Sequence, residues 1–187
     1  RVLFRSGKNA GLVIVTAKTD PSQKHQGISA FLVKKDSPGF IVGRLEDKMG
    51  LCASDTADLI FENCRVPAAD MLGNEGDGFK IAMRALDGGR IGISAQSVGV
   101  AQAAFDAAVK HAKGREQFGR KISKFQGLRW TIADMATEIE AARQFMFSAA
   151  AMKDRGENYT VQASMAKLFA SEMVNRVTAK ALQMHGG

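Results

Sequence analysis

The spacing of hydrophobic residues changes near residue 74, and this change constrains the fold more than any other feature of the 187-residue chain. Beyond it, apolar residues recur with the 3.6-residue period of an α-helix. They form three stripes: Phe79, Met83, Leu86, Ile93, Ala101, Ala104 and Ala108; Leu128, Ile132, Met135, Ile139, Ala142, Met146 and Ala150; and Met165, Phe169, Met173 and Val177. Gly114 and Gly156 stand where helix C-termini favour glycine. Helices of roughly 25 residues or more bury such stripes best in an antiparallel bundle, which we expect over residues 74–187.

Residues 1–73 show a different pattern, that of short strands separated by turns. The stretches GLVIVTAKTD, GISAFLVKKDSPGF, FIVGR and ADLIFENCRVP are rich in β-branched and aromatic residues, and the second alternates between two faces. Pro38, Gly39 and Gly50 separate them, and Pro67 closes the last strand because proline cannot continue a ladder. We therefore expect an antiparallel sheet or partial barrel here, and an α+β fold for the chain.

Composition excludes several classes of protein. Hydrophobic residues make up 45% and charged residues 24% of the chain, as in a soluble globular protein. No apolar run approaches the roughly 18 residues of a membrane span, and the N-terminal stretch lacks the apolar core of a secretory signal. Cys52, Cys64 and three scattered histidines form neither a disulfide framework nor a metal-ligand spacing. A reducing compartment is favoured, with structural cysteines and no metal.

Positive charge is concentrated in one segment, residues 110–129, which joins two of the expected helices. This segment carries nearly the whole net charge of +7. Its cationic residues are Lys110, Lys113, Arg115, Arg120, Lys121, Lys124 and Arg129, opposed only by Glu116. We call this segment the basic joint. A protein that coats nucleic acid spreads its cations along a face and adds stacking aromatics, so this local focus suits a small polyanion better.

Arg90 interrupts the apolar stripe of the first helix, and two interpretations fit it. A guanidinium in such a place needs a partner, and Asp87 lies one turn earlier at i,i+3. The arginine is then a satisfied ion pair. Alternatively, it lines a ligand slot, with Gly88, Gly89 and Gly92 letting a ligand approach the helix. Close helix packing also explains these glycines, each of which costs roughly 1 kcal/mol of helix propensity relative to alanine.

The start of the next helix also allows two interpretations. Ser123 and Gln126 have the spacing of a capping box, in which the glutamine reaches back to the backbone N–H of the cap. Arg115, Phe118 and Gly119 lie just before this helix start, where free N–H groups and the helix dipole favour an anion. The residues alone indicate no nucleophile with its base, no P-loop and no metal cluster.

Taken together, several stretches resemble the acyl-CoA dehydrogenase family of flavoproteins over residues 7–187. They are AKTDPS, KMGLCASDTADLIFENCRVPAADMLGNEGDGFKIAM, LDGGRIGISAQSVGVAQAAFDAA, REQFGRKISKFQ and QMHGG. Each is weak singly, but their order and spacing are specific. The resemblance implies that residues 1–73 are a middle-domain β segment that lacks its N-terminal part. Residues 74–187 are then a C-terminal helical bundle that lacks its last part.

The resemblance also implies roles for the unusual residues. Those matching family contacts to FAD, often made by a neighbouring subunit, are Arg115, Phe118, Gln126, Gln183, Met184, His185, Gly186 and Gly187. Those matching the segment beside the acyl-CoA thioester are Asp87, Gly88, Gly89 and Arg90. FAD is the implied cofactor, and the capping-box interpretation of Gln126 becomes weaker. The basic joint then supports a dinucleotide phosphate, and nucleic acid is not expected as a partner.

The family chemistry is α,β-dehydrogenation of an acyl-CoA thioester to a trans-2-enoyl-CoA, a reaction of fatty acid β-oxidation. A carboxylate removes the α-proton while the β-hydrogen leaves as hydride to the flavin, and hydrogen bonds to the thioester carbonyl stabilise the enolate-like charge. Electrons then pass to an electron-transfer flavoprotein. The motif at residues 86–106 is similar to short-chain, butyryl-type members. Alternatives are an acyl-CoA oxidase, a nitroalkane-type flavoenzyme or, from a different class, a basic nucleic-acid-binding module.

No catalytic residue is named, because the usual family glutamate is expected beyond Gly187. A minority of the family carries the base at the position that Gly89 occupies here, and glycine there favours the later position. We expect a homodimer or homotetramer, because family members share flavin contacts between subunits. The expected compartment is a bacterial cytoplasm or a mitochondrial matrix, with no membrane partner.

Overall fold

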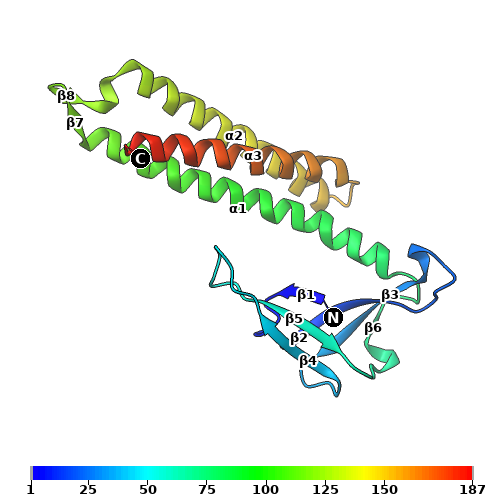
Figure 1. Ribbon diagram of the computed structural model, residues 1–187. Coiled ribbons are helices and arrows are strands. Elements are labelled where there is room, and N and C mark those ends of the chain that lie inside the picture. The colour runs from blue at the N-terminus through cyan, green and yellow to red at the C-terminus, as the bar shows by residue number, and fades with distance from the viewer. Residues whose placement is uncertain (1, 187) are drawn as a thin grey trace. The chain divides into compact units, whose positions relative to one another are not determined.

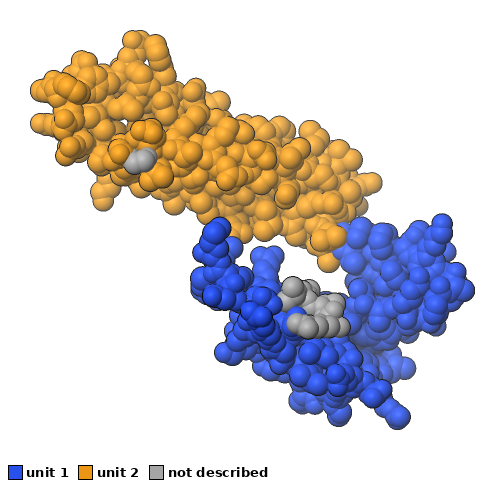
Figure 2. Space-filling model, viewed as in Figure 1, with its two compact units in different colours: residues 1–83 blue, residues 84–187 orange. Residues whose placement is uncertain are grey.

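The computed structural model describes residues 2–186 of the chain. The chain forms two compact units, one ending at Met83 and the other beginning at Arg84 (Figure 2). The first unit is built mainly from strands and the second mainly from helices (Figure 1). This arrangement confirms the α+β fold class, with a β-rich segment followed by a helical bundle. No described helix is both long and apolar enough to cross a membrane.

Two three-stranded sheets form the first unit, and every strand pairing in them is antiparallel. One sheet has the strand order β1–β5–β4 and the other β2–β3–β6. The strands are β1 (Val2–Arg5), β2 (Leu12–Lys18), β3 (Ile28–Lys34), β4 (Phe40–Leu45), β5 (Thr56–Phe61) and β6 (Met71–Leu72). Short 3₁₀ turns occupy His25–Gly27 and Ala68–Asp70.

The core of the first unit takes side chains from both sheets. Val13 of β2, Val33 of β3 and Leu59 of β5 are its buried members. The alternation in β3 does not separate an inner from an outer face, because Ser29 and Ala30 are both fully buried. β3 is the central strand of its sheet, and helix α1 begins against it. A Cβ on Gly78 would lie 2.5 Å from the carbonyl carbon of Ser29, so only glycine fits this approach.

Three long helices and one short hairpin form the second unit. The helices are α1 (Gly78–Gly114), which starts in the first unit, α2 (Gln126–Asp154) and α3 (Thr160–Met184). A hairpin of β7 (Glu116–Gln117) and β8 (Arg120–Lys121), followed by a 3₁₀ turn at Ile122–Lys124, connects α1 to α2. Figure 1 shows the end of α3 beside the last turns of α1, near this hairpin.

The helical core is rich in alanine, which lets the helices approach closely. The α2 stripe behaves as expected, with Met135, Ile139 and Ala142 buried. Met173 and Val177 of α3 are fully buried against them.

Parts of two expected apolar stripes, in α1 and in α3, are exposed and not buried as predicted. Phe79, Met83, Leu86 and Ile93 of α1 are exposed, and so is Met165 of α3. Periodicity shows that a face is apolar, but burial also needs a neighbour that covers it. These side chains stay at least 37% exposed, even Phe79 beside the ring of His25, whereas Ala101 and Ala108 further along α1 are fully buried.

Candidate functional site

The basic joint is an ordered hairpin at one end of the helical unit. The backbone N–H of Arg115 donates to the carbonyl of His111 at 2.8 Å, which continues the last turn of α1. The N–H of Ile122 donates back to the carbonyl of Arg115 at 2.9 Å and closes the hairpin. Phe118 and Gly119 form its turn with φ angles of +52° and +75°, as two-residue hairpins of this twist require.

Phe118 is an unusual residue for that turn. A left-handed backbone favours glycine or asparagine, and a phenylalanine there is strained. Its side chain is nevertheless 92% exposed at the tip of the hairpin. The ring meets Phe125 edge-on at 6.3 Å, and the Arg120 guanidinium lies 4.2 Å from the centre of the Phe125 ring. At this exposed tip, the ring of Phe118 is accessible to a second molecule.

The capping box expected at Ser123 and Gln126 is wrong. Ser123 lies inside the 3₁₀ turn, the N-cap of α2 is Phe125, and no side chain caps the helix. The box fails because it places the cap two residues too early. Gln126 becomes the exposed first residue of α2, so its side chain is available to a ligand.

A cationic pocket lies beside this helix start. It has a volume of about 570 Å³ and is lined by Lys113, Lys121, Ser123, Lys124 and Arg129. Among the residues that the structure describes, none of these four cations forms an ion pair. A cluster of unpaired cations at a helix N-terminus has the electrostatic character of an anion site.

A second pocket brings the C-terminal stretch to the basic joint. This pocket of about 550 Å³ is lined by Ala107, Lys110, His111, Gly114, Arg115 and His185. Arg115 and His185 therefore line one cavity although 70 residues separate them in sequence.

The other residues of the C-terminal stretch differ in exposure. Gln183 and Gly186 are exposed, and Gly186 has a φ angle of +95°. The side chain of Met184 packs in the helical core. Gly187 lies outside the described residues.

Asp87 and Arg90 belong to a different part of the helical unit, where polar groups are paired. The Arg90 guanidinium donates to Asp87 at 2.6 Å and to the hydroxyl of Ser164 at 3.1 Å. The Thr160 hydroxyl donates to the other oxygen of Asp87 at 2.7 Å. The ion pair expected at i,i+3 is thus confirmed. It also joins α1 to the start of α3, which the sequence did not indicate.

The glycines beside Arg90 are not explained by packing inside this chain. A Cβ built on Gly89 or Gly92 would meet no atom within 4 Å apart from neighbouring backbone of the same helix. On Gly88 it would meet only the Lys153 amine, at 3.7 Å. Close helix packing, one of the two explanations for these glycines, is therefore wrong for the described residues. The other explanation remains, in which the glycines leave an open helix surface that admits another molecule.

The two sets of site residues do not meet within one chain. At 1.5 Å per residue, the stretch of α1 from Arg90 to the joint at Arg115 spans about 37 Å. A ligand group that contacts Arg115 is therefore remote from Asp87 of the same chain. If both sets serve one catalytic centre, that centre takes them from two chains.

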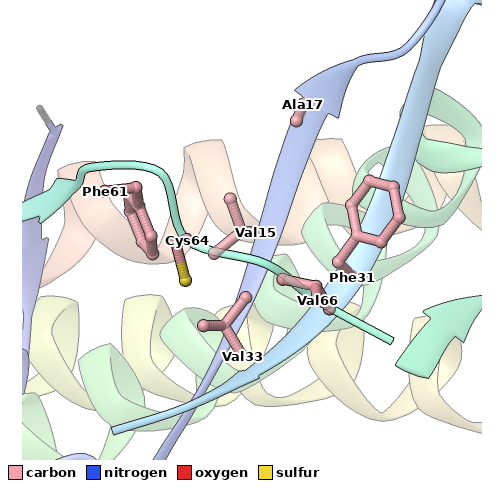
Figure 3. A pocket seen from close by; sticks show the side chains of 7 residues that line it. All are labelled: Val15, Ala17, Phe31, Val33, Phe61, Cys64 and Val66. Carbon is pink, nitrogen blue, oxygen red and sulfur yellow. The ribbon is translucent and has the colours of Figure 1, made fainter. Parts of the chain in front are cut away.

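The first unit contains an apolar pocket that the sequence did not indicate. It has a volume of about 320 Å³, and its lining comes from β2, β3 and the end of β5 with the segment that follows (Figure 3). The lining residues are Val15, Ala17, Phe31, Val33, Phe61, Cys64 and Val66. Its described lining includes no charged group to orient a ligand, so it is a weaker candidate than the basic joint.

We call the second pocket, which Arg115 and His185 line, the joint pocket. Two of its lining residues, Lys110 and His111, were not identified as site residues from the sequence. His111 lies one turn before Arg115, so the i,i+4 spacing on α1 was the available signal. Lys110 was counted only as part of the net charge.

Comparison with known proteins identifies both units. Residues 3–64 match the acyl-CoA dehydrogenase middle domain, and residues 76–187 match the acyl-CoA dehydrogenase C-terminal domain. Acryloyl-CoA reductase (NADH) of Anaerotignum propionicum is 51% identical over the whole chain, which covers 48% of that protein. The chain thus spans about half the length of the curated relatives that it matches.

Solved structures agree. Butyryl-CoA dehydrogenase of Megasphaera elsdenii is 48% identical with a TM-score of 0.94, over 98% of this chain and 48% of that one. A chain from the structure of the electron transferring flavoprotein of Acidaminococcus fermentans, studied for flavin-based electron bifurcation, is 55% identical with a TM-score of 0.94 over the same shares. PigA, solved with FAD and proline, is 30% identical with a TM-score of 0.92 and the same coverage. The chain belongs to the acyl-CoA dehydrogenase family.

Proposed function

We propose that the protein containing this chain is an FAD-dependent enzyme that removes hydrogen from Cα and Cβ of an acyl-CoA thioester. Family membership supports the reaction class. The observation that carries the cofactor assignment is the basic joint, whose unpaired cations line two pockets. Unpaired cations that converge on a cavity favour an anion of several charges, and the pyrophosphate of a dinucleotide meets that requirement.

The joint residues fit the phosphate side of FAD. Arg115 supplies a guanidinium that can donate two parallel hydrogen bonds to phosphate oxygens. Gln126 adds an amide at the uncapped start of α2, and Phe118 adds an exposed ring for the apolar parts of the ligand. His185 lines the same pocket as Arg115, and its neighbours Gln183 and Gly186 are exposed at the end of α3. When bound, FAD supplies the two-electron acceptor of the reaction.

The other end of the helical unit fits the substrate side. Asp87 and Arg90 hold each other in place, so the arginine presents a fixed edge to a neighbour. Gly88 and Gly89 leave the helix surface bare beside it, which lets a thin chain such as the pantetheine arm lie close to the backbone.

We further propose that the enzyme assembles as a homodimer or homotetramer. The separation of about 37 Å between Arg90 and Arg115 along α1 means that each centre needs the joint of a second copy. The exposed Phe118 and the unpaired cations of the joint are then explained as residues that act on a neighbour's cofactor.

For substrate and redox partner, we propose a short acyl chain and an electron-transfer flavoprotein. The butyryl-CoA dehydrogenase relative supports the first, and the structure from electron-bifurcation work supports the second. The relative named acryloyl-CoA reductase favours a second candidate, in which the same residues serve enoyl-CoA reduction. Both directions need the same cofactor and substrate contacts, so the electron donor or acceptor distinguishes them.

An anaerobic spectrum tests the proposal. We expect the purified protein to show a flavin band that bleaches when butyryl-CoA is added, and that crotonyl-CoA restores after chemical reduction. A flavin band that neither substrate changes would contradict the acyl-CoA assignment while keeping the cofactor. Absence of flavin, with no binding of added FAD, would contradict the cofactor assignment. Rapid reoxidation by oxygen would indicate an oxidase instead.

A further inference from the structure

Two of the three histidines of the chain meet at the joint pocket. The rings of His111 and His185 lie with their centroids 4.5 Å apart and their planes tilted by 33°. His185 is fixed by a contact of 2.9 Å between its Nδ1 and the carbonyl of Ala181. The pair joins the last turn of α1 to the end of α3, where both rings line the cavity beside Arg115.

The charged groups around this pair are almost all cationic. Lys110 of α1 and Arg115 of the joint line the same pocket, and no described carboxylate does. Asp106 of α1 accepts a hydrogen bond from Gln102 instead. Glu116 lies exposed on β7. From the other helices, Lys180 of α3 is paired with Glu138 of α2.

The proton balance of the pair therefore depends on what fills the pocket. An imidazole changes charge near neutral pH. A phosphate group bound beside Lys110 and Arg115 brings negative charge next to both rings, and this charge favours the imidazolium form. Both rings also lie at helix C-termini, where the dipole favours a cation.

We propose that His111 and His185 form one proton-binding unit that takes up a proton when a phosphate-bearing anion enters the joint pocket. The inference rests on the proposed function, because the cofactor pyrophosphate is the anion we assign there. It adds His111 to the anion site and makes anion affinity depend on pH. By linkage, uptake of one proton weakens binding by up to about tenfold for each unit of rising pH.

Calorimetric titration with the pyrophosphate diester ADP-ribose tests the inference directly, because its phosphates do not change protonation between pH 6.0 and 8.5. The purified flavin-free protein is titrated at pH 6.0, 7.0 and 8.5 in two buffers of different ionisation enthalpy. We expect proton uptake at pH 7.0 and a dissociation constant that rises with pH. His111→Phe keeps an aromatic ring but cannot carry the proton, so it should weaken binding at pH 6.0 and leave binding at pH 8.5 nearly unchanged. His185→Phe should behave in the same way.

His25→Phe is the matched control, because His25 belongs to the first unit and contacts Phe79 there. This control should keep the wild-type pH dependence. Equal weakening by His111→Phe at every pH would indicate a purely structural role and overturn the inference. Absence of ADP-ribose binding, or binding without proton uptake, would also overturn it. Circular dichroism verifies that each variant retains its helices.

The same titration with FAD separates the two proposals. FAD binding that is independent of pH would overturn the proton linkage and leave the cofactor assignment intact. Failure to bind FAD, together with ADP-ribose binding that depends on the histidine pair, would contradict the cofactor assignment and support the linkage. Parallel pH dependence for both ligands, lost in His111→Phe, supports both.

Discussion

In the part of the chain that the structure describes, positive charge is neutralised by side-chain partners at one end of the helical unit and left without such partners at the other. At the start of α1, Arg90 is paired with Asp87 and bonded to Ser164, so its charge is neutralised inside the fold. At the basic joint, seven cations face one acidic residue. Among the described cations of the joint, only Arg120 has a side-chain partner, the ring of Phe125. The first arrangement stabilises the protein, whereas the second carries repulsion that a bound anion relieves.

This comparison separates structural from functional charge. An arginine with a carboxylate and a hydroxyl contributes to stability whether or not it also touches a ligand. Cations without partners contribute nothing comparable to folding, so their arrangement is better explained by binding. Mutations at the joint should therefore change the affinity for FAD with little change in stability, whereas mutations of Asp87 or its partners should change stability with little change in the affinity for FAD.

The largest effect is expected for Arg115→Ala. Loss of a charge-assisted hydrogen bond to phosphate costs roughly 1.5–3 kcal/mol, so the dissociation constant for FAD should rise by about tenfold to a hundredfold. Flavin fluorescence on binding measures it. Lys167→Ala removes one exposed cation from α3, outside both pockets, and serves as the control. Equal loss of FAD in both variants would indicate a general effect of net charge.

Next comes Asp87→Ala, which should act mainly on stability. It removes the partner of both Arg90 and Thr160 and leaves a half-buried guanidinium without a carboxylate. We expect a loss of about 1–2 kcal/mol in the free energy of unfolding, measured by urea denaturation. Thr160→Val should cost less, because only one hydrogen bond is lost. A large loss of bound FAD with unchanged stability would contradict the structural role of this ion pair and indicate a role in cofactor binding.

Gly89→Ala tests the bare helix surface beside Arg90. Alanine has the higher helix propensity, and its Cβ would meet no described atom within 4 Å beyond the backbone of its own helix, so stability should rise by up to about 1 kcal/mol. Turnover should fall if a substrate lies against this surface. Thermal unfolding and steady-state kinetics measure the two effects. A variant that is more stable and equally active would show that this glycine has no role in substrate binding.

The smallest effect is expected at Glu138, which pairs with Arg176 and Lys180 between α2 and α3. Burial raises the pKa of Glu138, but the hydrogen bonds from Arg176 and Lys180 outweigh burial, so its pKa lies below the ordinary value of 4.5. The resulting stability is present above that ordinary value and is lost as pH falls through the lower pKa of the folded state.

Glu138→Gln should therefore destabilise the protein by less than about 1 kcal/mol at pH 7. The difference from the wild type should shrink towards pH 3, because more of the wild-type carboxyl becomes neutral as pH falls through its lowered pKa. Urea denaturation at both values measures it. A difference that persists unchanged at pH 3 would show that packing, and not charge, is responsible.

Local patterns in the sequence predicted much of this fold. The period of α2 identified Met135 and Ile139 as core residues, and the i,i+3 spacing identified the pair of Asp87 and Arg90. Such predictions succeed because the interacting residues are close in sequence. The exposed Leu86 and Ile93 were misassigned to the core because periodicity does not say whether a neighbour covers a face.

Contacts between distant residues were not accessible from patterns. Arg90 and Ser164 are 74 positions apart, and nothing in either stretch indicates the other. The same holds for the rings of His111 and His185, which meet only because α1 and α3 end side by side. The capping box at Ser123 failed for a local reason, since a 3₁₀ turn displaced the helix start by two residues.

The uninterrupted course of α1 limits how genes for such proteins can change in length. Each residue inserted between Asp87 and Arg115 would advance the joint by 1.5 Å and rotate it by about 100° relative to the Asp87 end. A single codon gained or lost there would turn the joint away from the end of α3. Insertions and deletions among relatives should therefore collect in the turns, such as residues 155–159, and spare this stretch of α1 unless seven residues enter together, since two helical turns nearly restore the original direction.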